Sequence, residues 1–153
     1  MGVRSCETPD SVLWRFQHLR IDPCFYLGGR YLKSVRWTGR LEAEGREVLN
    51  TGKNSRSIPR LDFEIEAAAR SVQKLRPDIL TVMLGSNNLL QRPGFAAEVC
   101  GERVERFLSV FSGKVSLVLQ IAPLPMELGT WVTGKRLLTE FRRLVGCYQE
   151  LAH

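Results

Sequence analysis

Apolar and polar residues from Arg36 onward alternate in blocks whose spacing predicts helices and strands in turn. Residues 79–84 and 115–121 form near-continuous apolar runs, which are typical of strands buried on both faces of a parallel sheet. The remaining pattern predicts a short strand over residues 47–50 and helices over residues 37–44, 62–75, 96–111 and 134–151. We expect Asp62 to cap the second of these helices. Strands that alternate with helices indicate one α/β domain, a three-layer α/β/α sandwich around a flavodoxin-like parallel sheet.

In such a sheet the functional site is expected in the loops beyond the carboxyl ends of the strands. These loops are residues 51–59, 85–93 and 122–131. Residues 1–20 depart from the regular pattern, because Arg15, Gln17 and His18 interrupt the stretch where the first apolar strand is expected. We therefore expect an atypical N-terminal segment within a single domain of residues 1–153.

Composition and charge narrow the function classes. Of the 153 residues, 44% are hydrophobic and 25% are charged, as in globular domains and unlike disordered chains. No apolar run is long enough to span a membrane and no signal peptide is recognisable, so we expect a cytoplasmic protein without a membrane partner. The net charge of +6 arises from dispersed basic residues interleaved with acidic ones, so no nucleic-acid partner is expected. The four cysteines lack metal-ligand spacing and only two histidines are present, so no metal site is expected.

The strongest motif is Leu84-Gly85-Ser86-Asn87-Asn88-Leu89, which directly follows an apolar run. Gly85 allows a sharp turn, after which Asn87 can project its amide over the strand ends and donate to a developing oxyanion. The alternative is that both asparagines merely satisfy a turn. Residues 48–57 (Val-Leu-Asn-Thr-Gly-Lys-Asn-Ser-Arg-Ser) also follow a strand, and their small residues permit a backbone N–H to point into the same cleft. Two oxyanion donors from adjacent loops form half of an acyl-transfer site.

These two segments, in this order and separated by a helix, resemble blocks II and III of the SGNH (GDSL-like) hydrolases. Residues 36–41 and 121–126 resemble the bacterial arylesterase and acetyl-esterase branch, and the resemblance covers roughly residues 21–153. It implies a cofactor-free serine ester hydrolase that acts on a small ester or acylated substrate. By this match Asn87 donates its side-chain amide to the oxyanion and Ser55 donates its backbone N–H, with Gly85, Arg56 and Trp131 beside the substrate.

Two catalytic segments of that family are not found in the sequence. The family's nucleophile lies in a Gly-Asp-Ser motif that ends the first strand, and no Gly-Asp-Ser occurs in this sequence. The most similar segment is Asp10-Ser11, which makes Ser11 the candidate nucleophile. The family's base is the histidine of an Asp-x-x-His motif after a fifth strand. This sequence stops within the helix after the fourth strand, where Glu150 and His153 have only a related spacing. The resemblance thus implies an incomplete sheet, truncated at the C-terminus, and impaired catalysis.

Codon degeneracy offers an explanation for the absent nucleophile motif. Residues 14–20 (Trp-Arg-Phe-Gln-His-Leu-Arg) can be encoded as TGG CGA TTC CAA CAC CTA CGG, and reading from the second base gives Gly-Asp-Ser-Asn-Thr-Tyr-Gly. We hypothesise a pair of compensating frame shifts, with the frame restored near Ile21. Residues 12–16 are then expected to occupy the central slot of the first strand as a substitute.

Three interpretations of function follow from the sequence. The chain is an SGNH-type esterase, or a non-catalytic protein that keeps the cleft and holds a small polar or acylated ligand, or a degenerate gene product without function. Ester turnover distinguishes the first from the second, and poor expression without cooperative unfolding marks the third.

Overall fold

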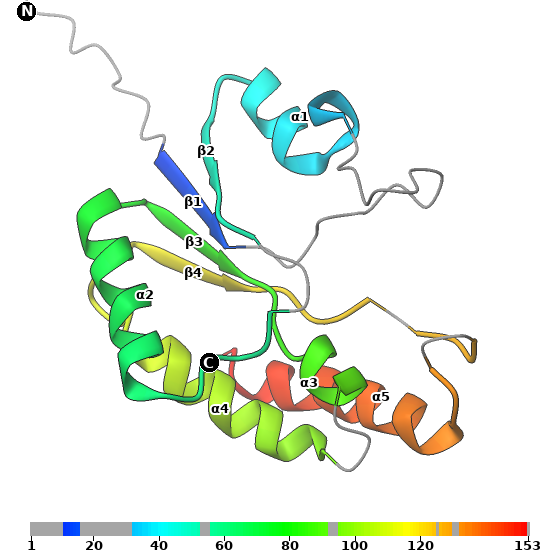
Figure 1. The fold of residues 1–153 in the computed structure, drawn as a ribbon. Helices are drawn as coiled ribbons and strands as arrows, with labels where there is room; N and C mark the ends of the chain where they lie inside the picture. Colours follow the sequence, from blue (N-terminus) through cyan, green and yellow to red (C-terminus); the bar gives the residue numbers. More distant parts are fainter. Residues whose placement is uncertain are drawn as a thin grey trace, which may run out of the picture.

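The computed structural model describes residues 11–15, 32–52, 56–91, 95–124, 126–129 and 132–152. Figure 1 shows its elements, which along the chain are β1 (Ser11–Arg15), η1 (Lys33–Val35), α1 (Trp37–Ala43), β2 (Glu47–Asn50), α2 (Asp62–Leu75), β3 (Ile79–Val82), α3 (Ser86–Gln91), α4 (Ala97–Ser109), β4 (Leu117–Gln120) and α5 (Lys135–Glu150). The predicted helices and strands from Trp37 onward are all confirmed, with β2 and α2 at their predicted bounds. Among the described helices none is long and apolar enough to cross a membrane.

The four described strands form one parallel sheet in the order β2-β1-β3-β4. Ser11 of β1 lies opposite Glu47 of β2, and Val12 lies opposite Ile79 of β3. Ile79 in turn lies opposite Leu117 of β4. The first strand is therefore central, as the flavodoxin-like order predicts.

The strand β1 shows how the sheet accommodates the atypical N-terminal segment. Ser11–Arg15 fills the central slot, one residue earlier than the predicted substitute strand. Ladder hydrogen bonds use backbone N–H and C=O groups, which any five residues without proline supply. The edges of β2 and β3 are thus paired although the residues of β1 do not form the expected apolar run.

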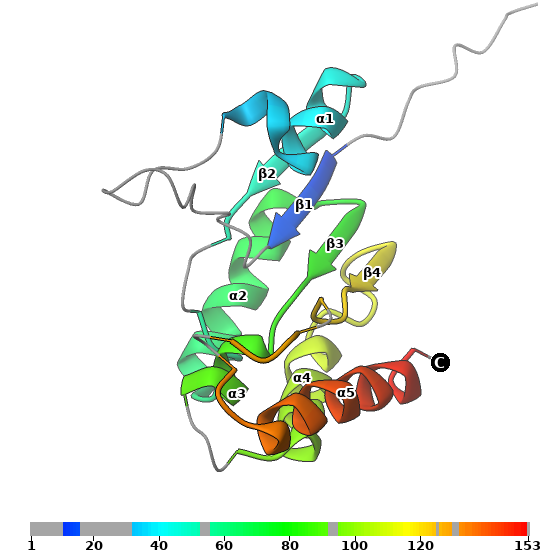
Figure 2. The same ribbon diagram turned by 90° about the vertical axis from the view of Figure 1, so that its right-hand side faces the viewer.

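Helices lie on both sides of the sheet and give the fold its three layers (Figure 2), and an apolar cluster lies on each face. Leu80, Val82 and Leu84 belong to the larger cluster, with α2, α4 and α5. Ile79 and Met83 belong to the smaller cluster, which includes α1. Since successive side chains of a strand point to opposite faces, β3 contributes to both clusters and is the centre of the core.

A buried carboxylate joins α5 to the start of α4. Glu140 Oε2 accepts a hydrogen bond from Ala97 N at 2.7 Å, and its Oε1 accepts one from Arg143 Nη1 at 3.0 Å. The first N–H groups of a helix carry partial positive charge, so a carboxylate at this position stabilises α4. The two helices are therefore fixed to each other by charge as well as by apolar packing.

The structure corrects the predicted loop over residues 85–93. The short helix α3 lies inside it, and Leu89 of α3 is fully buried while Asn88 is 5% exposed. Six residues are too few to show a helical period, and their Ser-Asn-Asn start is typical of turns. The strands before and after this region are also shorter than predicted and end at Val82 and Gln120.

The predicted capping of α2 by Asp62 is wrong. Leu61 is the N-cap residue, and Glu64 Oε2 accepts hydrogen bonds from Leu61 N at 3.0 Å and Arg60 N at 2.9 Å. This is the returning half of a capping box, in which the third helical residue satisfies free N–H groups before the helix. Asp62 instead forms an ion pair with Arg106 of α4.

Candidate active site

The segments that follow β2 and β3 lie at one edge of the sheet, beyond the carboxyl ends of the parallel strands (Figure 1). Residues 56–60 lead from this edge into α2, and residues 83–85 lead from β3 into α3. Arg15, the last residue of β1, ends at the same edge between them. Two of the three predicted site loops are thus brought together.

Gly85 turns the chain from β3 into α3 in a conformation that favours glycine. Its φ is +103°, and an added Cβ would lie 2.9 Å from Leu144 Cδ2 and closer still to Tyr148 Oη. Tyr148 is held there because its hydroxyl donates a hydrogen bond to Leu84 O at 2.9 Å. The sharp turn predicted at Gly85 is confirmed, and α5 packs directly against it.

The two asparagines of α3 hold the neighbouring loop. Asn87 Nδ2 donates to Arg56 O at 3.1 Å, and Asn88 Oδ1 accepts from Ile58 N at 2.9 Å. The two contacts join residues that are 31 and 30 positions apart in the sequence. The loop after β2 is therefore fixed in position by two side chains from the loop after β3.

One N–H of the Asn87 amide is left without an acceptor among the described residues, which is what binding of an oxyanion would need. The Asn87 side chain is half-buried and carries two N–H groups, of which Arg56 O accepts one. Acyl transfer also needs a nucleophile and a base, which together generate the attacking alkoxide. Both histidines of the chain, His18 and His153, lie outside the described residues.

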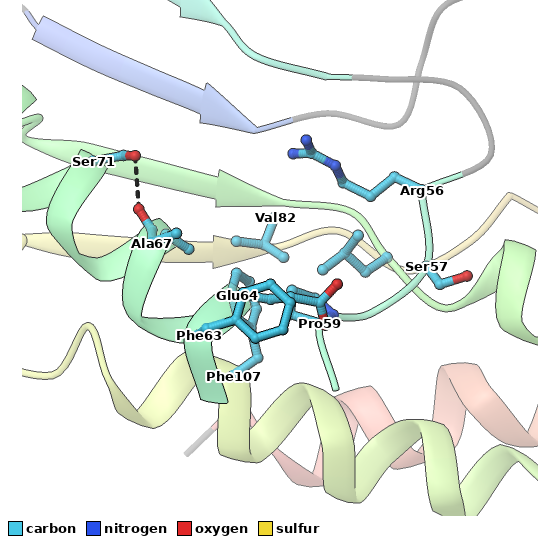
Figure 3. Close-up of a pocket in the computed structure, with 11 residues that line it drawn as sticks. Arg56, Ser57, Pro59, Phe63, Glu64, Ala67, Ser71, Val82 and Phe107 are labelled. Atoms are coloured by element: carbon cyan, nitrogen blue, oxygen red, sulfur yellow. Dashed lines mark hydrogen bonds between the residues drawn. The ribbon is translucent and has the colours of Figure 1, made fainter. Parts of the chain in front are cut away.

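A cavity of about 330 Å³ lies beside this edge, between α2, β3 and α4 (Figure 3). Its wall is mainly apolar, from Pro59, Phe63, Ala67, Ala68, Val82, Leu84 and Phe107, with Arg56, Ser57, Glu64 and Ser71 as the polar groups. In Figure 3 the Arg56 side chain reaches over the space above Val82, and Phe63 borders it from the α2 side. A volume of this size is at the lower end of small-molecule sites.

Burial and hydrogen bonds set the protonation of the groups around these features. Burial raises the pKa of Tyr148 above its ordinary value and the pKa of the Cys100 thiol to about 12. Tyr148 therefore stays a neutral donor rather than a base. Hydrogen bonds from the backbone N–H groups of Leu61 and Arg60 lower the pKa of Glu64, which keeps its carboxylate charged.

Comparison with solved structures shows the same architecture in several esterases. The proposed arylesterase from Agrobacterium tumefaciens str. C58 superposes with a TM-score of 0.73 at 23% sequence identity, over 94% of this chain and 78% of that chain. Est24, a carbohydrate acetylesterase from Sinorhizobium meliloti, gives a TM-score of 0.71 at 20% identity, over 94% and 79%. The aryl esterase of M. smegmatis gives 0.70 at 17% identity, over 94% and 79%.

The chain has the SGNH hydrolase fold. No protein-family model matches its sequence, and no curated protein matches it significantly. The likeness thus lies in the arrangement of helices and strands, which agrees with the fold that the sequence motifs predict.

The predicted site residues fall into three groups in this SGNH fold. Gly85, Asn87 and Arg56 meet at the carboxyl edge of the sheet. Ser55 and Trp131 lie outside the described residues. Ser11 is the first residue of β1, at the amino edge, roughly 13 Å from the carboxyl edge for a five-residue strand.

Sequence reasoning missed three features around the candidate site. The hydrogen bond from Ile58 N to Asn88 Oδ1 was not predicted. A second polar residue beside Asn87, directly after a buried strand, was a signal that could have indicated it. The contact of Tyr148 with Leu84 was not predicted either, because the spacing of Tyr148 with Phe141 and Leu144 indicates burial but not a hydrogen-bond partner. The cavity depends on the distance between layers, and no sequence pattern marks it.

Proposed function

We propose that this chain derives from an SGNH-type serine ester hydrolase and that, as it stands, it does not turn over esters. The proposed origin is supported by the carboxyl edge of the sheet, where Gly85 forms the turn after β3 and the Asn87 amide donates to the loop after β2. The sequence supports the proposed lack of turnover, because it contains neither Gly-Asp-Ser nor Asp-x-x-His. The solved neighbours named as arylesterases and carbohydrate acetylesterases suggest small esters, acetyl esters among them, as the ancestral substrates.

The proposed role of each residue follows from acyl-transfer chemistry. When a nucleophile adds to an ester carbonyl, the oxygen becomes an anion, and donors placed at that position lower the barrier. Asn87 would supply its second N–H, and the backbone N–H of Ser55 would supply another donor. Removing one such donor from a working enzyme lowers kcat about 10²–10³-fold. Hydrogen-bond donors alone do not form the attacking alkoxide. Without it the tetrahedral oxyanion that these donors would stabilise does not form.

The position of β1 supports the frame-shift hypothesis. The alternative reading of the codons begins inside Trp14, and β1 ends at Arg15. It would therefore place the glycine and the aspartate at the last two positions of the central strand and the serine directly after it, at the edge where Gly85 and Asn87 lie. The nucleotide sequence tests this. Codons for residues 11–20 that preclude the shifted reading would end the hypothesis.

Hydrolysis of p-nitrophenyl acetate by the purified protein tests the proposed loss of activity. We expect no turnover above the buffer rate from protein that shows a folded circular dichroism spectrum. The variants Asn87→Ala and Ser11→Ala serve as comparisons. Turnover that falls in either variant while the spectrum is unchanged would show that the chain is a working esterase with a nucleophile our proposal does not supply.

A second candidate function is ligand binding without turnover. The observation that favours it is the cavity between α2, β3 and α4, whose lining has both apolar and charged groups. Saturable binding of a small molecule by a protein without esterase activity would support this function.

A further inference from the structure

No described residue pairs with the charged group of Arg56 at the mouth of the cavity. The Arg56 side chain is half-buried and lines the cavity, and its guanidinium has no hydrogen bond or ion pair with any described residue. The acid that shares the cavity, Glu64, directs Oε2 to the N–H groups of Arg60 and Leu61. A partly desolvated guanidinium without a counter-ion is costly, and an anion beside it would lower that cost.

The main chain holds Arg56 in this place independently of its side chain. Its carbonyl oxygen accepts the hydrogen bond from Asn87 Nδ2, and two residues later Ile58 N donates to Asn88 Oδ1. Both contacts use backbone atoms of the loop. The guanidinium therefore extends from a fixed anchor over the cavity, as Figure 3 shows.

The rest of the cavity is suited to an apolar group. Val82 and Phe107 are each 1% exposed and form its inner wall, whereas Phe63 is 64% exposed beside it. An aromatic ring that lies so open to solvent gains from any apolar ligand that covers it. The fork of donors on a guanidinium matches the two oxygens of a carboxylate.

We propose that this cavity binds a monocarboxylate that carries a compact apolar group. The carboxylate pairs with the Arg56 guanidinium, and the apolar group lies against Val82, Phe107 and Phe63. The site is on the α2 side of the sheet, and Asn87 is not among its lining residues. Binding requires no turnover, so the proposal does not depend on whether the chain hydrolyses esters.

Isothermal titration calorimetry of the full chain with phenylacetate tests this proposal. The neutral match is 2-phenylethanol, and acetate is the match without the apolar group. Arg56→Gln removes the charge and keeps the backbone contacts of the loop. Arg60→Gln is the control, because Arg60 is an exposed arginine of the same loop that does not line this cavity. Ala68→Leu places a larger side chain in the cavity, and its thermal unfolding confirms that it is folded.

We expect saturable binding of phenylacetate that is at least about tenfold weaker in Arg56→Gln, unchanged in Arg60→Gln and lost in Ala68→Leu. 2-Phenylethanol and acetate should each bind at least about tenfold more weakly than phenylacetate. No binding of phenylacetate to the folded chain would overturn the proposal. Equal binding of the acid and the alcohol, or equal losses in the two arginine variants, would overturn it as well, since the carboxylate would then not be recognised by Arg56.

Discussion

Replacement of Gly85 by alanine tests whether the turn before α3 depends on glycine for two separate reasons. The first is backbone strain: Gly85 has a φ of +103°, and a strained backbone conformation costs about 1–3 kcal/mol. The second is steric overlap: the new Cβ would lie 2.9 Å from Leu144 Cδ2 and closer to Tyr148 Oη. Overpacking a core costs about 1–3 kcal/mol. We therefore expect Gly85→Ala to lower the free energy of unfolding by about 2–6 kcal/mol.

Two further variants separate these contributions. Gly113 has a φ of +69° and nothing within 4 Å of an added Cβ, so Gly113→Ala measures backbone strain alone. Tyr148→Phe removes the hydroxyl that the new Cβ would meet, and it leaves the buried Leu84 carbonyl without its donor at a cost of about 1–3 kcal/mol. Because the two changes relieve one another, the double variant should lose about 1 kcal/mol less than the sum of the single losses.

Urea denaturation followed by circular dichroism measures the free energies of unfolding of all four variants and the parent. A cost of Gly85→Ala no larger than that of Gly113→Ala would show that the overlap does not exist. Additivity of Gly85→Ala and Tyr148→Phe within about 0.5 kcal/mol would show that the Tyr148 hydroxyl is not the obstacle. Either result refutes the account of Gly85 given above.

Three other predictions concern charge and burial. Glu140→Gln should lower the free energy of unfolding by about 1–2 kcal/mol in urea denaturation, because α4 loses the carboxylate at Ala97 N; no change would mean that the charge is irrelevant there. The pKa of Glu64 is lowered in the folded state, so its stabilisation is present above its unfolded pKa and is lost as the pH falls through the folded pKa. The stability difference between the parent and Glu64→Gln should accordingly shrink between neutral and strongly acidic pH in denaturation series, and a constant difference would contradict this. Burial raises the pKa of Cys100 to about 12, so peptide mapping after iodoacetamide treatment at pH 8 should find Cys100 unmodified in the native protein and modified in urea; equal rates in both would show that the thiol is accessible.

The sequence predicts most of the fold because its long elements have clear periods. The helix Asp62–Leu75 is found at its predicted bounds because helical spacing defines it, and the short strand Glu47–Asn50 is found at its bounds because polar turn residues flank it. The helix α3 was missed because its burial depends on tertiary contacts of Leu89 and not on a local pattern. The capping of α2 was misassigned because Asp62 and Glu64 are both acidic residues at the start of the helix that can accept hydrogen bonds from its free N–H groups. Only the contacts in the structure show that Glu64 does so and that Asp62 pairs with Arg106.

The candidate site was predictable where it rests on the turn after β3. Gly85 and Asn87 could be placed because a glycine after a buried strand predicts a turn at the carboxyl edge of the sheet. The partner of Asn87 could not be predicted, because Arg56 lies 31 residues away and is brought near only by the packing of α2. The cavity could not be predicted for the same reason.

The residues at the carboxyl edge of the sheet and the catalytic motifs that the sequence lacks place different demands on a sequence. The residues at the carboxyl edge have structural contacts, since Gly85 fits against Tyr148 and Asn88 satisfies a buried N–H of Ile58. Loss of these residues would destabilise the fold whether or not the chain is active. Side chains on surface loops contribute less to stability, and β1 shows that residues without an apolar run can occupy the central strand. A likeness in fold that covers 94% of the chain therefore does not establish hydrolysis. The deciding evidence is the presence of the serine and the histidine.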